Sequence, residues 1–119
     1  MPRWSMPSPD TIRLRHMHEP VTMALHMAAG RSRTELSSDP MLAMALTRTL
    51  EILGEGASRL SDEARLRFTS IPYAKMVAMR NRLIHAYFDV DLDIVWTTVA
   101  EDLPPLLPVL ESALAQLEK

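Results

Sequence analysis

The fold is decided by residues 39–56, which read DPMLAMALTRTLEILGEG. Asp39 is of a type preferred at helix N-caps, and Pro40 suits the first helical position, where its missing N–H costs nothing. Small or apolar side chains then recur at helical spacing: Leu42, Ala45, Leu46, Thr49, Ile52 and Leu53. Gly54 and Gly56 fall inside this pattern at a cost of about 1 kcal/mol each, which favours the close approach of another helix. The stretch therefore predicts an amphipathic helix in a helical bundle.

Upstream of this helix, the sequence predicts a lead-in and one long helix. Residues 1–9 contain three prolines, which is typical of a disordered terminal segment. We expect a helix from about Thr11 to Ala29, in which Pro20 either causes a kink or marks the true start. Gly30 ends this helix, and the polar residues 31–38 are expected to form a loop.

Downstream, three more helical segments are expected. The first two lie at about residues 61–68 and from residue 70 to His85 or Tyr87. The last begins near Asp91, and its prolines predict a break before Leu110: Pro104, Pro105 and Pro108. The chain shows no strand alternation and no internal repeat. Residues 10–119 are therefore expected to form one all-α domain, a bundle of four to five helices.

Composition limits the environment and the class of protein. The 119 residues include no cysteine, which excludes disulfides and thiolate metal sites and fits a reducing cytoplasm. No apolar run reaches the roughly 20 residues that span a bilayer, and the N-terminus lacks a secretory pattern, so we expect a cytoplasmic protein. The net charge is −2 at pH 7. Arginine makes up nearly all the cations, which suits phosphate contact but equally fits a GC-rich genome.

Arg80 breaks the pattern of a plain helical bundle. On a helix covering residues 76–88, the apolar side chains share one broad arc with Arg80 near its middle. A guanidinium in such an arc costs several kcal/mol unless its charge and donors are satisfied. Arg80 is therefore either paired with a buried carboxylate or directed at an anion in a cleft. The sequence leaves both interpretations open.

His85 is the second candidate in this helix. It lies one turn after Asn81, at a helix C-terminus where the helix dipole favours a protonated imidazole. A histidine that titrates near neutrality suits general acid–base catalysis. Because His85 points about 140° away from Arg80 around the helix, either Arg80 folds around the helix or a second subunit completes the site. This spacing favours a homodimer.

Residues 79–91, which read MRNRLIHAYFDVD, strongly resemble the HEPN family of the HepT type. That family carries an arginine followed directly by a polar residue and, four to six residues on, by a histidine. Here the pattern falls on Arg80, Asn81 and His85. The similarity continues into residues 94–104 and back into residues 50–61.

The resemblance implies a homodimeric, metal-independent endoribonuclease with an HEPN-like helical fold. The ribose 2′-hydroxyl of an RNA substrate would attack the adjacent phosphate, with His85 moving the proton, Arg80 binding the phosphate and Asn81 orienting the groups. It further implies the toxin of a toxin–antitoxin pair. The antitoxin would be a minimal nucleotidyltransferase that transfers AMP to Tyr87.

Two alternative functions remain from the sequence. One is a non-catalytic helical dimer that binds and regulates a nucleotidyltransferase partner, and the other is an anion-binding domain in which Arg80 only holds a phosphate. A histidine metal site is disfavoured, because His16 and His18 project to different sides of a helix. We interpret the paired methionines as core filler: Met41 and Met44, and Met76 and Met79.

Overall fold

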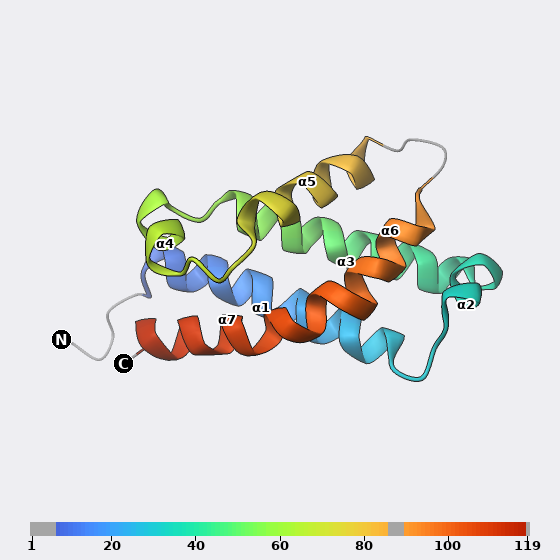
Figure 1. Cartoon of the computed structure of the whole chain (residues 1–119), viewed down its shortest axis with the longest axis horizontal. Coiled ribbons are helices and arrows are strands. Elements are labelled where there is room, and N and C mark those ends of the chain that lie inside the picture. Colours follow the sequence, from blue (N-terminus) through green and yellow to red (C-terminus); the bar gives the residue numbers. More distant parts are fainter. Residues whose placement is uncertain (1–6, 86–89, 119) are drawn as a thin grey trace.

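The computed structural model describes residues 7–85 and 90–118, and all regular structure in these ranges is helical. Four long elements run alternately up and down the molecule (Figure 1). They are α1 (Pro9–Ala28), α3 (Pro40–Ser58), α5 (Tyr73–Ile84) and a continuous bent element made of α6 (Leu92–Thr97), the π-helical turn η1 (Thr98–Asp102) and α7 (Leu103–Leu117). The short helices α2 (Arg33–Ser38) and α4 (Asp62–Arg67) lie in the connections. The all-α fold class is confirmed.

The central helix α3 begins as the sequence predicts. The Leu42 N–H donates to the Asp39 side chain at 3.1 Å, and Pro40 occupies the first turn. The Arg31 guanidinium also binds the Asp39 carboxylate, at 2.8 Å. The Leu42 N–H and Arg31 together hold the pKa of Asp39 below its usual value. Asp39 is thus a charged N-cap of α3 that also binds Arg31, in the turn between α1 and α2.

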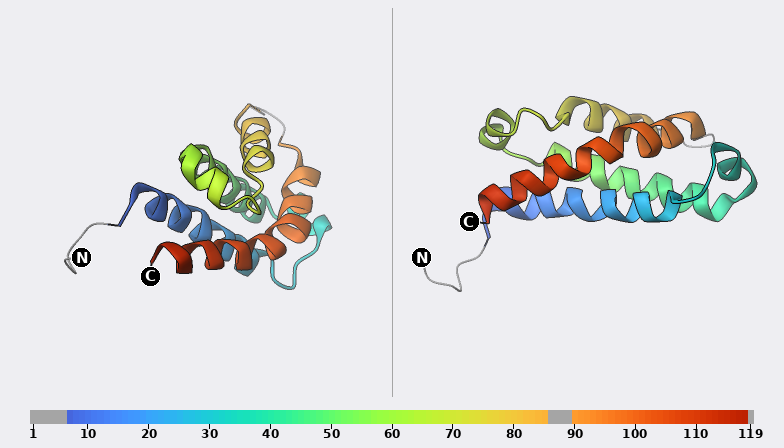
Figure 2. Two further views of the ribbon diagram at one scale, coloured as in Figure 1. Left: turned by 60° about the vertical axis from the view of Figure 1, so that its left-hand side comes forward. Right: turned by 60° about the horizontal axis from the view of Figure 1, so that its bottom comes forward.

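The core forms where α3 packs between α1 and α5, with α7 against α1. Leucines of α3 are fully buried at Leu46, Leu50 and Leu53. Figure 2 shows α6 and α7 lying across one side of α1 and α3. The ion pair between Arg15 and Glu118, at 2.7 Å, joins the start of α1 to the end of α7. The outer side of α3, away from α6 and α7, is left to form a surface of its own.

One predicted backbone feature is wrong, and for Pro20 one of the two predicted roles is excluded. Residues 31–38 are not a plain loop, because α2 forms there behind a capping box in which Ser32 and Glu35 satisfy each other's backbone N–H groups. Pro20 does not mark a helix start, since α1 begins at Pro9 and continues through Pro20, which is buried. Whether residues 1–9 are disordered stays a prediction, because residues 1–6 lie outside the described ranges.

The predicted break in the last helix is real but misplaced. The chain widens at η1, where the Leu103 N–H bonds the Thr98 carbonyl, five residues earlier. Pro104 and Pro105 follow directly, and neither can donate to a carbonyl in the preceding turn. From Leu103 the helix then continues unbroken through Pro108 to Leu117.

The methionine pairs divide between core and surface. Met76 and Met79 are buried, as predicted. The interpretation of Met41 and Met44 as core filler is wrong, because they are 82% and 73% exposed on the outer side of α3. Their helical spacing matches a buried stripe, but both side chains lie on a face of α3 that the described helices leave exposed. No helix in the described part of the chain is long and apolar enough to cross a membrane.

Candidate active site

Arg80 is placed by a glycine on the neighbouring helix. A Cβ atom at Gly54 would lie 2.2 Å from the Arg80 Cβ and 2.9 Å from the Met76 carbonyl oxygen. Those distances are far inside van der Waals contact, so α5 can approach α3 this closely only because residue 54 has no side chain. The predicted close approach of a helix at this position is confirmed, and the side chain that it seats is Arg80.

The polar contacts of Arg80 are incomplete. Its Nη1 lies 3.5 Å from the Glu55 Oε2, which is a long ion pair, and its side chain is 20% exposed. Its Nε is buried and has no hydrogen-bond partner among the described residues. Glu55 also accepts a shorter bond, 2.9 Å, from the Arg59 Nε. The single carboxylate is thus shared between two arginines and cannot fully satisfy either guanidinium.

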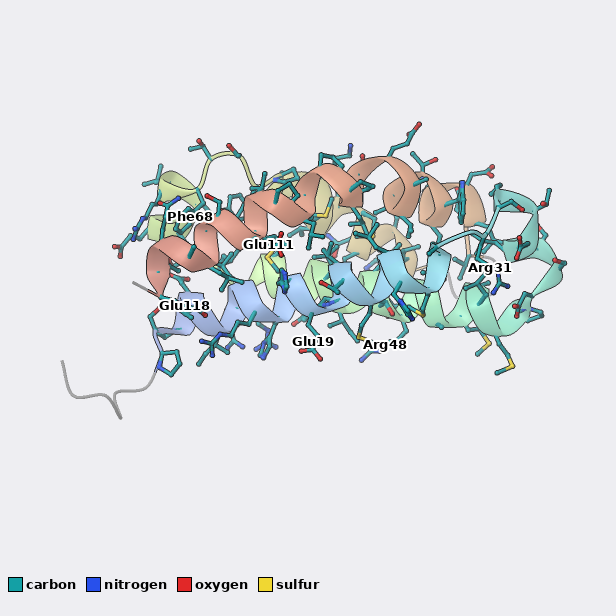
Figure 3. The ribbon with its side chains drawn as sticks, turned by 90° about the horizontal axis from the view of Figure 1, so that it is seen from below. Glu19, Arg31, Arg48, Phe68, Glu111 and Glu118 are labelled. Atoms are coloured by element: carbon teal, nitrogen blue, oxygen red, sulfur yellow. The ribbon has the colours of Figure 1, made fainter. Side chains whose placement is uncertain are left out.

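Arg80 lines a cleft of about 410 Å³ on the outer side of α3. Three helices line it: α1 contributes Arg13 and His16, α5 contributes Arg80 and Ile84, and α3 forms the floor. Besides Ile52 and Gly56, the floor is lined by four charged side chains: Arg48, Glu51, Glu55 and Arg59. Figure 3 shows Arg48 projecting from the side of the molecule that faces away from α6 and α7.

The cleft is positive although the whole chain is negative. It holds four arginines against two glutamates, whereas the chain carries a net charge of −2. The glutamates are both engaged, because Glu51 lies 3.3 Å from Arg48 and Glu55 is shared by Arg59 and Arg80. A concave site with an excess of arginines attracts anions and suits phosphate groups in particular.

The other predicted site residues lie apart from this cleft. Asn81 and His85 are exposed at the C-terminal end of α5, and neither lines the cleft. The His85 backbone N–H bonds the Asn81 carbonyl at 3.2 Å, so these two residues are stacked one turn apart as predicted. Ile84, between them in sequence, turns toward the cleft. Tyr87 lies outside the described residues.

Sequence reasoning missed most of the cleft. Arg13 lies far from the Arg80 motif in sequence, and Arg48 and Arg59 read as the solvated face of an amphipathic helix. The spacing of Arg48, Glu55 and Arg59 on one face of α3, beside the two glycines, is the signal that could have pointed here. No group of three side chains that could hold a metal ion occurs among the described residues.

The described residues thus form a helical bundle that seats Arg80 in a cationic cleft, with His85 at the end of the same helix but outside that cleft. A family model described as Ribonuclease HepT-like matches residues 17–113. The chain therefore belongs to the HepT-like family, and the predicted family and the enzyme class, ribonuclease, are confirmed at that level.

Relatives from bacteria and archaea agree with this family. A "Putative RNase" of Caldanaerobacter subterraneus is 33% identical over 93 residues, which cover 78% of this chain and 83% of that protein. Another "Putative RNase", of Methanocaldococcus jannaschii, is 38% identical over 60% of this chain and 66% of its own length. A "Probable ribonuclease HepT" of Thermococcus cleftensis is 41% identical over 57% of this chain and 62% of its own length. No solved structure matches the chain significantly.

Proposed function

We propose that this protein is a metal-independent endoribonuclease that acts as the cytoplasmic toxin of a toxin–antitoxin pair. The observation that supports it most directly is Arg80, whose Cβ and Cγ pack against Gly54 and whose guanidinium is incompletely paired and faces a cationic cleft. A purely structural arginine in a bundle would be satisfied by a buried carboxylate. Glu55, which is 47% exposed and shared with Arg59, does not provide that.

The reaction uses the ribose 2′-hydroxyl of the RNA itself as the nucleophile. A new bond forms between the 2′-oxygen and the adjacent phosphorus while the bond from phosphorus to the 5′-oxygen of the next nucleotide breaks. The products are a 2′,3′-cyclic phosphate and a 5′-hydroxyl. His85 removes the proton of the attacking hydroxyl or supplies one to the leaving oxygen. Arg80 holds the phosphate and stabilises the charge that builds on it, and Asn81 orients the reacting groups.

A homodimer would complete this site. Arg80 faces the cleft of its own chain, whereas His85 lies outside that cleft, so we expect a second subunit to bring an Arg80 and a His85 together. Ile52 and Ile84 border the cleft and are 42% and 37% exposed, which leaves apolar surface next to Arg80 for a partner to cover.

The composite site predicts complementation between two inactive variants. We expect Arg80→Ala and His85→Ala chains, each inactive alone, to recover roughly a quarter of the wild-type cleavage rate when they are unfolded and refolded together in equal amounts. Half of a random mixture of dimers is mixed, and one site in each mixed dimer would be intact. Cleavage of a fluorescent RNA measures the recovery.

The control for this experiment is each variant refolded with itself. If the mixed sample forms dimers by light scattering but stays as inactive as the controls, Arg80 and His85 do not act across the subunits. If the wild-type chain is a monomer while it cleaves RNA, the homodimer itself is excluded.

Neutralisation by a nucleotidyltransferase antitoxin is proposed to act at Tyr87. The added AMP would place negative charge and bulk two residues from His85 and would repel the RNA phosphate. Intact-mass and peptide mass spectrometry after co-expression with the partner should find AMP on the peptide containing Tyr87. A Tyr87→Phe chain should carry none and should remain toxic in the presence of the partner. AMP on another residue, or none at all, would contradict this assignment.

A further inference from the structure

The α1 side of the cleft carries a guanidinium and an imidazole that the proposed chemistry at Arg80 does not use. Arg13 and His16 lie three residues apart on α1 and both line the cleft. Neither side chain has an ion pair or hydrogen bond with any described residue, in contrast to Arg48, Arg59 and Arg80, which each face a glutamate. The α1 side is therefore where the cleft is least neutralised.

This part of α1 packs beside a second glycine of α3, Gly56. A Cβ atom at Gly56 would lie 3.0 Å from the Met17 Cγ, 3.5 Å from the His16 carbonyl oxygen and 3.6 Å from the Arg13 carbonyl oxygen. The backbone of these two cleft residues therefore lies next to Gly56, at distances that are ordinary van der Waals contacts even for an added Cβ. Because Gly54 and Gly56 project about 200° apart on a helix, Gly54 lies against Arg80 of α5 and Gly56 lies against α1 at Arg13 and His16.

Glu55, between the two glycines in sequence, places a negative charge in the cleft. Its carboxylate is bound by Arg59 at 2.9 Å and lies 3.5 Å from Arg80. An incoming phosphate is repelled from this carboxylate and attracted to the cations on the two sides. Arg80 provides one such position. Arg13 and His16, which pair with no carboxylate among the described residues, provide the other position.

We propose that Arg13 and His16 form a second anion subsite, which binds a backbone phosphate of single-stranded RNA next to the phosphate held at Arg80. The inference rests on the proposed function, because it takes the strand cleaved at Arg80 as the ligand. A cleft of about 410 Å³ is the size of a small-molecule pocket and accepts a strand of nucleotides but not a duplex. The planar fork of Arg13 matches two phosphate oxygens, and the His16 ring can donate one further hydrogen bond.

Binding of a non-cleavable RNA tests this subsite. A fluorescein-labelled, fully 2′-O-methylated oligonucleotide lacks the attacking hydroxyl, so fluorescence anisotropy measures affinity without cleavage. We expect Arg13→Ala to weaken binding about fivefold or more and to lower the slope of log K against log salt by about 0.7, the value for one lost phosphate contact on a single strand. His16→Gln should weaken binding by a smaller factor.

Arg15→Ala is the matched control. Arg15 lies on the same helix and loses the same charge, but it pairs with Glu118 at 2.7 Å and does not line the cleft. We expect less than a twofold change for this variant. Thermal unfolding of each variant checks that it is folded, and the exposed His16 provides a second test should Arg13→Ala unfold.

Separate outcomes reveal which proposal fails. If the wild-type chain cleaves RNA but Arg13→Ala and Arg15→Ala bind equally, the subsite is wrong and the ribonuclease proposal stands. If the wild-type chain neither cleaves RNA nor binds the methylated strand, both are overturned. If Arg13→Ala loses affinity and Arg15→Ala keeps it, the subsite is supported.

Discussion

Replacing His85 by alanine is expected to lower the rate of RNA cleavage by about 10²–10⁴-fold, the usual contribution of a general acid–base group. The imidazole of His85 is of the side-chain type that most often serves as a general acid or base, and it lies at the exposed end of α5. Because His85 is exposed, its removal should change the free energy of unfolding by no more than about 0.5 kcal/mol. The loss should therefore be one of rate and not of folding.

His26→Ala is a suitable control for this variant. His26 is also an exposed histidine in the last turn of a helix, and it lies away from the cleft. We expect this variant to cleave RNA at the wild-type rate. Cleavage by His85→Ala within tenfold of wild type would contradict the role of His85 as the proton carrier.

The wild-type and His85→Ala chains also test the toxin proposal in cells. Expression of the wild-type chain without its partner should slow bacterial growth and change the RNA profile, whereas expression of His85→Ala should do neither. If the wild-type chain leaves both unchanged, the toxin proposal fails. The non-catalytic dimer that regulates a nucleotidyltransferase then becomes the better interpretation.

The fold could be predicted from the sequence where the signals are local. The Asp39 cap and the first-turn Pro40 act within one turn of helix, so the start of α3 follows from residue types alone. The helix α2 was missed because it has only six residues, which is too few for a hydrophobic periodicity to be visible. Its capping box was the only local signal of a helix start. The exposure of Met41 and Met44 depends on which element covers α3, and that is a property of tertiary packing.

The site could be predicted only in part for the same reason. Arg80 was found because a guanidinium in an apolar arc is anomalous within one helix. Its surroundings were not found, because Arg13 reaches the cleft only through the packing of α1 on α3, and Arg80 meets Glu55 only through the packing of α5 on α3. The net charge of −2 hid this cleft, since an average over the chain does not show where arginines gather. The two glycines were the one signal in the sequence that pointed to this packing.

Gly54→Ala is expected to destabilise the protein by about 2 kcal/mol and to lower the cleavage rate about 10²-fold. In an isolated helix this change is favourable by about 1 kcal/mol. Here the new Cβ would meet the Arg80 Cβ at 2.2 Å and the Met76 carbonyl oxygen at 2.9 Å, and neither atom can move without moving the backbone of α5. Overpacking of this kind costs about 1–3 kcal/mol or more. A displacement of Arg80 by about 1 Å would in addition lower the rate about 10²-fold.

Gly56→Ala, two residues away, is the control that separates the effect of packing on stability from the effect of helix propensity. It gains the same intrinsic preference, but its new Cβ would meet chiefly the Met17 side chain, with the closest atom at 3.0 Å. A methionine side chain can shift by a few tenths of an ångström, so the stability of this variant should stay within about 1 kcal/mol of wild type. Urea unfolding and RNA cleavage of both variants make the comparison. If Gly54→Ala is as stable and as active as Gly56→Ala, then α5 does not depend on Gly54, and Arg80 is positioned by some other contact.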